Sequence, residues 1–283
     1  MLTTSGFQQW ISAQMRVVGA IVRKDLLVFF RYPANAIMTV IEPIMFLTPA
    51  YFMGLGFSVG GRAVGFEGFT GTADHFSFVL IGAFMGSYIS AAFWGIAYSV
   101  KEDMLVGVLE SNWVSPAGRV TLIIGRSIFM LIGTTLNSLV VLILGALIFR
   151  LNLTGDVLIA VLTMIPMLIA LAGFGLGLAG IVLVVREADT AIDISNYLVG
   201  TLSGSKFPVA MLPRPILAIA LALPTTYGFD AVRGILLGTK TLMPMRQEFL
   251  IMIGSMTAMC IGGYFLFRTL ERRCRRLGVL GTY

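Results

Sequence analysis

Few side chains in this sequence have the types and spacing that catalysis or metal binding requires. The single histidine, His75, stands far from the two cysteines, Cys260 and Cys274, so the chain contains no set of residues with metal-ligand spacing. One histidine in what we expect to be a solvated loop also gives no nucleophile with a neighbouring base. The sequence therefore predicts no metal, no cofactor and no catalytic residues, and both cysteines are expected to be free thiols.

The segment 234–241 is the nearest approach to a phosphate-binding loop. That loop requires the pattern G-x-x-x-x-G-K-[ST] after a strand. Here three residues separate Gly234 from Gly238, and Thr239 stands between the second glycine and Lys240. The pattern instead indicates a helix that ends in a glycine cap, so any energy from ATP must reach this chain through another protein.

A carboxylate and a polar segment interrupt the apolar runs of the chain. Glu42 lies within an apolar stretch, where a charge is expensive and marks either a functional group or a specific partner. The alternative is that Glu42 is protonated or lies near the inner interface. Further along, Asn196, Tyr197 and Thr201 share one side at helical spacing. We take these four residues as candidates for lining a pathway or a two-fold seam, with core or lipid contact as the alternative.

The composition identifies the solvent in which these residues must work. Of the 283 residues, 57% are hydrophobic and 12% are charged, and the mean hydropathy is +0.92. A soluble domain has about 25% charged residues, so an ordinary soluble enzyme and a disordered chain are both excluded. The net charge of +6 is then better explained by a membrane surface than by nucleic acid. We predict an all-α membrane protein with a single transmembrane domain over residues 1–283.

Six apolar runs approach the roughly 20 residues that a helix needs to cross a bilayer. The predicted spans are 34–57, 77–100, 121–149, 157–185, 190–206 and 247–268. The further stretch 207–238 is interrupted by prolines, so we expect two re-entrant segments there that enter the outer leaflet. Gly173 and Gly177 in the fourth run predict close helix packing, either within the chain or between two copies.

Positive charges indicate the orientation of these spans. With both termini in the cytoplasm, 13 of the 20 Lys and Arg residues lie on the inner side. Before the first span, the segment 8–32 has an apolar face and a basic face, which predicts a helix lying in the inner interface. Its cations, which we expect near the lipid head groups, are Arg16, Arg23, Lys24 and Arg31.

The second cytoplasmic loop predicts a short amphipathic helix over 103–114, which Pro116 ends. The apolar residues, which would face membrane or protein, are Leu105, Val108, Leu109 and Trp113. The acidic residues, which would face water, are Glu102, Asp103 and Glu110. A short cytoplasmic helix parallel to the membrane is suited to binding a soluble partner. The alternative is a solvated loop with one helical turn.

The same loop resembles the coupling helix of ABC-2 type exporter permeases, the membrane subunits of ATP-binding-cassette transporters. The shared pattern is E-x-x-x-G-x-L-E-x-x-x-x-[ST]-P, which here comprises Glu102 or Asp103, Gly107, Leu109, Glu110, Ser115 and Pro116. Val108 departs from the threonine that the family often carries. The segment 23–33 also resembles the family's entry helix. A later series of family motifs is represented by Phe207, Pro208, Pro213, Pro224, Tyr227, Asp230 and Arg233.

The resemblance implies a non-enzymatic permease subunit in a bacterial plasma membrane. It would export a hydrophobic or amphipathic substrate, such as a drug, a lipid-like molecule or a glycan-linked molecule. Two copies of a soluble ATP-binding subunit and a second permease copy or homologue would complete the transporter. The docking residues would be Glu102, Asp103, Leu105, Gly107, Leu109, Glu110, Trp113 and Pro116. The main alternative is a secondary transporter or channel without an ATPase partner, followed by an intramembrane enzyme or scaffold.

Overall fold

The computed structural model describes the greater part of the chain. The described residues are 4–31, 37–38, 41, 45, 48–49, 51–54, 56, 58–59, 62–63, 66–72, 74–114, 119–149, 153–185 and 188–276. The predicted span 34–57 therefore lies largely outside the described residues, and Glu42 is among those outside.

The described residues fold almost entirely into helices. From the N-terminus these are α1 (Thr4–Arg31), α3 (Glu67–Thr70), α4 (His75–Ala92), the π-helical segment η1 (Phe93–Ala97), α5 (Tyr98–Leu105) and α6 (Leu109–Val114). They continue as α7 (Arg119–Phe149), α8 (Val157–Val185), α9 (Ala188–Leu202), the 3-10 turn η2 (Val209–Met211), α10 (Arg214–Ala220), α11 (Pro224–Leu237) and α12 (Met245–Arg276). Within the same residues, β1 (Ser58–Val59) and β2 (Arg62–Ala63) form a short antiparallel hairpin.

Four of the described helices are long and apolar enough to cross a membrane. They cover His75–Leu105, Thr121–Leu147, Val157–Val185 and Met245–Arg276, with 27 to 32 residues each. At about 1.5 Å per residue, each exceeds the roughly 30 Å of a bilayer core. The chain is therefore an all-α, multi-pass membrane protein, as its composition predicts.

The polar run predicted as a span at 190–206 forms a shorter helix than expected. α9 has 15 residues, about 22 Å in length, and the chain turns at Gly204, whose φ is 77°. Beyond it, α10 and α11 meet at a bend of 88°. Pro215 and Pro224 lie in the first turns of these two helices, where proline is tolerated. Two short helices therefore lie where two re-entrant segments were predicted, and their entry into the outer leaflet stays a prediction.

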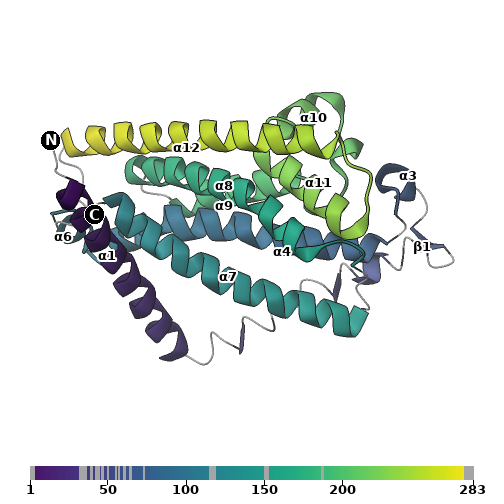
Figure 1. Cartoon of the computed structure of the whole chain (residues 1–283), viewed down its shortest axis with the longest axis horizontal. Helices are drawn as coiled ribbons and strands as arrows, with labels where there is room; N and C mark the ends of the chain where they lie inside the picture. Colours follow the sequence, from purple (N-terminus) through teal and green to yellow (C-terminus); the bar gives the residue numbers. More distant parts are fainter. Residues whose placement is uncertain are drawn as a thin grey trace.

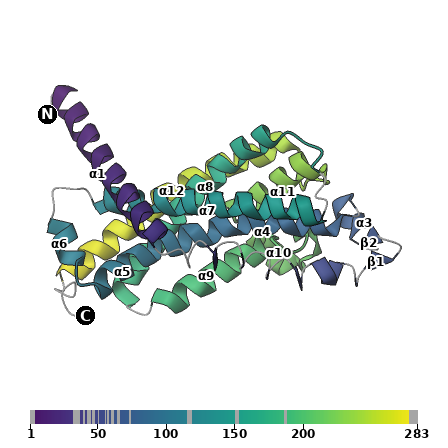
Figure 2. The same cartoon turned by 90° about the horizontal axis from the view of Figure 1, so that it is seen from below.

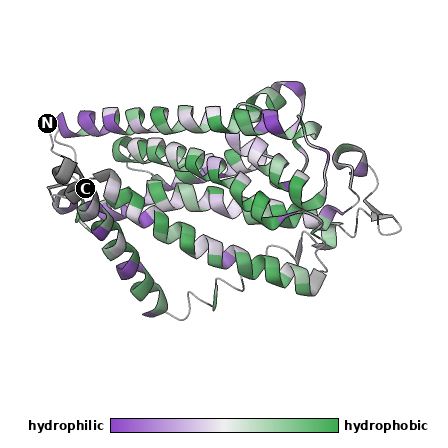
Figure 3. Cartoon of the chain, in the orientation of Figure 1, coloured by the Kyte–Doolittle hydropathy of each residue, from purple (hydrophilic) through white to green (hydrophobic). Residues whose placement is uncertain are grey.

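The long helices lie side by side along the longest axis of the molecule (Figure 1). The beginning of α1, the short helix α6 and the end of α12 lie at one end, whereas α3 and the β hairpin lie at the other (Figures 1 and 2). Hydrophobic residues dominate the middle of α4, α7, α8 and α12 (Figure 3). An apolar band thus separates two more polar ends, which is the distribution that a bilayer requires.

α8 lies at the centre of the packing and contacts α12 through small residues. A Cβ atom on Gly173 would lie 2.7 Å from the backbone of Cys260, and one on Gly177 would lie 3.3 Å from the Cα atom of Gly263. Glycine permits this close approach of two helix backbones. Of the two alternatives for Gly173 and Gly177, the structure therefore supports packing within the chain.

Gly263→Ala is expected to destabilise the protein by about 1–3 kcal/mol, whereas Gly262→Ala is expected to be neutral or slightly stabilising. A Cβ atom on Gly263 would lie 1.8 Å from the carbonyl oxygen of Gly173, so α8 and α12 would have to separate. A Cβ atom on Gly262 would meet no atom within 4 Å. Thermal unfolding of the two purified variants measures the difference, and equal midpoints would contradict the predicted role of Gly263.

Candidate functional site

A cavity of about 550 Å³ lies between α4, α7 and α9. Its walls are residues 79–95 of α4 and η1, 130–141 of α7, 196–201 of α9 and the loop residues 205–206. The volume is within the range of small-molecule sites in proteins. α4 and α7 belong to helices that are long and apolar enough to cross a membrane, so the cavity lies along two candidate spans.

Close contacts fix how the three walls align. Near the beginning of α4, a Cβ atom on Gly82 would lie 1.8 Å from the carbonyl oxygen of Ser205, so the loop after α9 touches α4 directly. One turn further, the hydroxyl groups of Ser87 and Ser138 lie 2.9 Å apart. The hydroxyl of Ser90 donates to Oδ1 of Asn196 at 3.2 Å. The cavity therefore runs along the helix axes, with polar contacts gathered near its middle.

The three candidates predicted on the polar segment line this cavity: Asn196, Tyr197 and Thr201. Sequence reasoning missed the opposite wall, where Thr134, Asn137 and Ser138 also line the cavity. Their spacing of i, i+3 and i+4 in an otherwise apolar helix was the signal that could have identified them. Glu42, the fourth candidate, lies outside the described residues. The part that these residues play in transport stays a prediction.

Side chains of the predicted re-entrant motif connect α11 to the segments before and after it. The hydroxyl of Tyr227 donates to the carbonyl oxygen of Leu221 at 2.8 Å. The carboxylate of Asp230 accepts a hydrogen bond from the backbone N–H of Leu242 at 2.6 Å. Pro224 lies in the first turn of α11. The remaining motif residues before Arg233 lie in the connection from α9 to α10: Phe207, Pro208 and Pro213.

Arg233 is 3% exposed and joins three segments of the chain. Its guanidinium donates to the carbonyl oxygens of Phe78, Gly204 and Ser205, at 3.2, 2.7 and 2.8 Å. Its Cζ atom also lies 3.6 Å from the ring centroid of Phe78. Because Ser205 borders the cavity, Arg233 of α11 fixes the end of the cavity where α4 begins. The charge of Arg233 is balanced by these carbonyl dipoles and the ring face, together with the nearby carboxylate of Asp230.

The predicted cytoplasmic helix at 103–114 is broken in the structure. Residues up to Leu105 continue the membrane-crossing helix, Gly107 turns with a φ of 71°, and α6 begins at Leu109. Glycine adopts this left-handed conformation without the steric cost that other residues meet. α6 alone is a separate short helix. Pro116 lies outside the described residues, as do the side chains of Glu110 and Trp113.

The orientation of Asp103 also differs from the prediction. It was expected to face water, but it is 8% exposed because Arg126 of α7 covers it, with Nη2 of Arg126 2.6 Å from Oδ1 of Asp103. Leu109 is buried within the chain. Leu105 and Val106 are 68% and 67% exposed, so these two residues provide the apolar surface at this turn.

Polar contacts join this turn to two walls of the cavity. The second carboxylate oxygen of Asp103 accepts a hydrogen bond from the side-chain amide of Asn112 in α6, at 3.2 Å. Asp103 therefore connects α6 with Arg126 of α7. On the other side, Nζ of Lys101 lies 2.5 Å from a carboxylate oxygen of Asp189 in α9. Helix α5 is thus tied to both α7 and α9, the helices that line the cavity together with α4.

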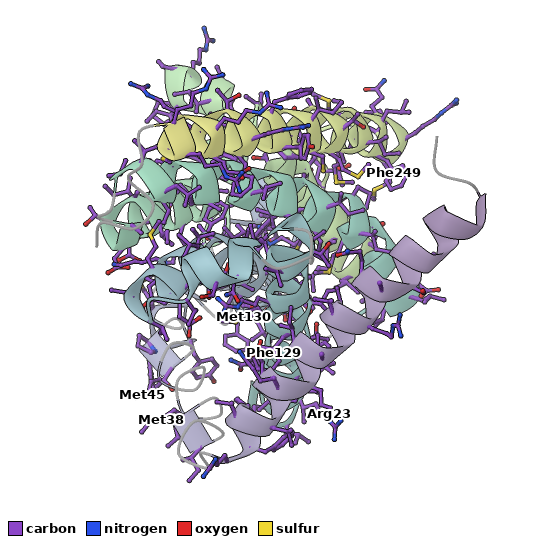
Figure 4. The ribbon with its side chains drawn as sticks, turned by 90° about the vertical axis from the view of Figure 1, so that its left-hand side faces the viewer. Arg23, Met38, Met45, Phe129, Met130 and Phe249 are labelled. Carbon is purple, nitrogen blue, oxygen red and sulfur yellow. The ribbon has the colours of Figure 1, made fainter. Side chains whose placement is uncertain are left out.

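α1 crosses the same end of the molecule at an angle to the other helices (Figure 4). It begins four residues before the predicted segment 8–32, at Thr4. Its four predicted cations are exposed: Arg16, Arg23, Lys24 and Arg31. Arg23 points away from the bundle in Figure 4. The opposite face packs on α7, where Cδ1 of Ile21 lies 2.9 Å from the position of a Cβ atom on Gly125.

His75 does not lie in a solvated loop, in contrast to the prediction. It is the first residue of α4, and its ring packs edge-on against Phe66 at 5.0 Å between centroids. Its Nδ1 atom is buried without a hydrogen-bond partner among the described residues. Cys260 and Cys274 are free thiols. In the part of the chain that the structure describes, no group of three or more His, Cys, Asp or Glu residues is placed to hold a metal ion.

The fold and the cavity define a class of protein, namely a multi-pass helical membrane protein with an internal site between its spans. The sequence matches the family model of the ABC-2 type transporter over residues 16–237. A search among curated proteins finds no match to the chain. Because the family model covers most of the sequence, the chain belongs to the ABC-2 type transporter family. It is a permease subunit of an ABC transporter, as its motifs predict.

Proposed function

We propose that this permease exports its substrate, and that separate ATP-binding subunits supply the energy. The chain itself would hydrolyse no ATP. It would cross the membrane six times, through the four long helices, the predicted span 34–57 and α9. The shared position of the beginning of α1, α6 and the arginine-rich end of α12 supports a cytoplasmic location for this end of the protein (Figure 2).

The proposed docking surface comprises α6, the exposed turn at Leu105 and Val106, and the basic face of α1. Two ATP-binding subunits would bind there, one on each of two permease copies. An exposed apolar pair at a polar end of a membrane protein favours a protein partner. This end also carries exposed arginines near the expected head groups. A bacterial plasma membrane is the expected location.

The observation that supports this function most strongly is the linkage from α6 to the cavity walls. Asn112 of α6 bonds to Asp103, and Asp103 pairs with Arg126 of α7. Lys101 extends the linkage to Asp189 of α9. A partner that moves α6 would therefore pull on the helices that enclose the cavity. Substrate would be an amphipathic molecule, since the cavity combines serine, threonine and asparagine side chains with aromatic rings.

Leu105→Asp is expected to reduce binding of the ATP-binding subunit at least about tenfold, because it places a charge in the apolar part of the proposed surface. Met211→Asp is the matched control, since Met211 is 44% exposed near the opposite end of the chain's long helices. Co-purification with the ATP-binding subunit encoded beside this chain measures the effect. Equal binding by both variants would contradict this docking surface. Transport by the permease alone on an ion gradient would instead establish a secondary transporter.

A further inference from the structure

Two acidic side chains lie together where α12 begins. Glu248, in the first turn of α12, is fully buried, and Asp230 of α11 is partly buried. Their carboxyl groups are close enough to form a hydrogen bond with each other. The backbone N–H of Leu242 donates to Asp230 at 2.6 Å. The next N–H, that of Met243, donates to Oε1 of Glu248 at 3.0 Å. α11, the following loop and α12 therefore meet at one pair of carboxyl groups.

The contact between these two groups requires a proton. Ionised carboxylates only accept hydrogen bonds, so a hydrogen bond between Asp230 and Glu248 needs one of them to be protonated. Two carboxylates in contact also repel each other strongly in a buried site, where water screens them little. The N-terminus of α12 favours a negative charge on Glu248, but this effect is weaker than the repulsion between adjoining carboxylates. The pair therefore holds one proton.

The surroundings indicate which of the two carboxyl groups holds it. Oε2 of Glu248 is buried and receives no hydrogen bond from the described residues. An ionised Glu248 would leave this oxygen without a donor, whereas a protonated Glu248 is itself a donor. Asp230 lies near the cation of Arg233 and accepts the hydrogen bond from Leu242, and both contacts favour its ionised form. The proton is therefore expected on Glu248 and the negative charge on Asp230.

The other titratable groups near this pair have different partners or are exposed. The hydroxyl of Tyr227 is close to Glu248 but donates to a backbone carbonyl oxygen after α10. The guanidinium of Arg233 donates to carbonyl oxygens of α4 and of the loop after α9. Lys240 and Arg246 are exposed. α8, which packs on both α11 and α12, has no titratable side chain. Among the described residues, none of these groups is placed to neutralise Glu248 in place of a proton.

We propose that Asp230 and Glu248 form a proton-binding site that joins α11 to α12. At neutral pH the proton lies on Glu248, and the hydroxyl formed there donates to the carboxylate of Asp230. Release of this proton to water would leave two carboxylates in contact and would push α12 away from α11. Because Arg233 of α11 also holds α4 and the loop after α9, the loss would loosen that end of the cavity. Proton binding is independent of the proposed export function.

Infrared spectroscopy of the purified full chain in dodecyl maltoside tests the site directly. This detergent has no carbonyl group, so the C=O stretch of a protonated carboxyl group is not hidden by lipid esters. We expect a protonated-carboxyl component at neutral pH that disappears on alkaline titration. Glu248→Gln should remove this component, because it deletes the protonated group. Glu67→Gln is the matched control and should retain it, since Glu67 is exposed on α3.

Thermal unfolding as a function of pH gives an independent measurement. At neutral pH the folded chain holds a proton on Glu248 that an ordinary glutamate in the unfolded chain has released. Raising the pH from about 6 to about 8 should therefore favour unfolding, by at most about tenfold in the unfolding equilibrium constant per pH unit. Glu248→Gln should lack this component, because its amide donates to Asp230 without titrating, and Glu67→Gln should keep it.

A wild-type spectrum with no protonated carboxyl group at neutral pH, or one that Glu248→Gln leaves unchanged, overturns the proposal. Asp230→Asn provides a second assignment if Glu248→Gln fails to fold, because it should shift the component and not remove it. Loss of the component in Asp230→Asn would contradict a proton on Glu248. Equal pH dependence of unfolding in the wild type and Glu248→Gln would also overturn the site. Stabilisation of the wild type alone by sodium over choline would show a metal cation there instead.

Discussion

Replacing Arg233 with methionine is expected to lower the free energy of unfolding by about 3–5 kcal/mol. Methionine is unbranched like the stem of arginine but is shorter and has no donor, so the carbonyl oxygens of Gly204 and Ser205 lose the hydrogen bonds that they accept at 2.7 and 2.8 Å. The carbonyl oxygen of Phe78 and its ring lose the same guanidinium. Because these groups belong to α4 and the loop after α9, the loss should loosen one end of the cavity.

Thermal unfolding of the purified full chain measures this effect. Arg214→Met is the matched control, since Arg214 is exposed at the beginning of α10. Arg233→Lys should give an intermediate midpoint, because an ammonium group does not reproduce the planar fork that reaches three acceptors. If Arg233→Met and Arg214→Met unfold at the same temperature, the clamp contributes nothing to stability.

The long apolar helices were predictable because no other pattern competes with them. The fourth predicted span, 157–185, has the bounds of α8, since Asp156 and Arg186 border an uninterrupted apolar run. The extent of the second span was underestimated. The sequence suggests an end at Val100 because charges follow. The helix continues to Leu105 since all three of these charges, Lys101, Glu102 and Asp103, pair with residues of other helices.

The sequence also failed to predict the break at Gly107. Apolar and acidic residues alternate at helical spacing on both sides of it, so the pattern favours one continuous helix over 103–114. The conformation of a single glycine, with a φ of 71°, overrides that pattern. The burial of Asp103 depends on Arg126, which is 23 residues away in the chain. A sequence pattern does not reveal which helix will cover a charge.

The polar lining of the cavity was predicted on one side only. Asn196, Tyr197 and Thr201 stood out because α9 is polar as a whole, and all three line the cavity. Asn137 and Ser87 were overlooked because each is a polar residue within a long apolar helix, where lipid contact or core packing is the ordinary expectation. Their proximity depends on the register between α4 and α7, which arises only when the helices pack.

Arg126→Gln is expected to destabilise the protein by about 3–5 kcal/mol and to lower ATP-dependent export at least about tenfold. The side chains of Arg126 and Asp103 are 19% and 11% exposed, so loss of the cation leaves a buried carboxylate without its partner. The same guanidinium donates to the carbonyl oxygen of Ser99 at 2.8 Å. Glutamine cannot make both contacts and carries no charge. The connection from α6 to α7 would therefore be lost.

A double-mutant cycle with Asp103→Asn tests whether this pair acts as a unit. Asp103→Asn alone should also destabilise the protein, because it removes the closer and more buried of the two carboxylates that pair with Arg126, and leaves only Glu102 at 3.5 Å. The double variant should be less destabilised than the sum of the two single variants, since neither charge is then left behind. Arg272→Gln is the control, because Arg272 is exposed near the C-terminal end of α12. This substitution should change neither unfolding nor export. Additive losses in the cycle would show that Arg126 and Asp103 stabilise the protein separately, and α6 would then have no route to α7 through this pair.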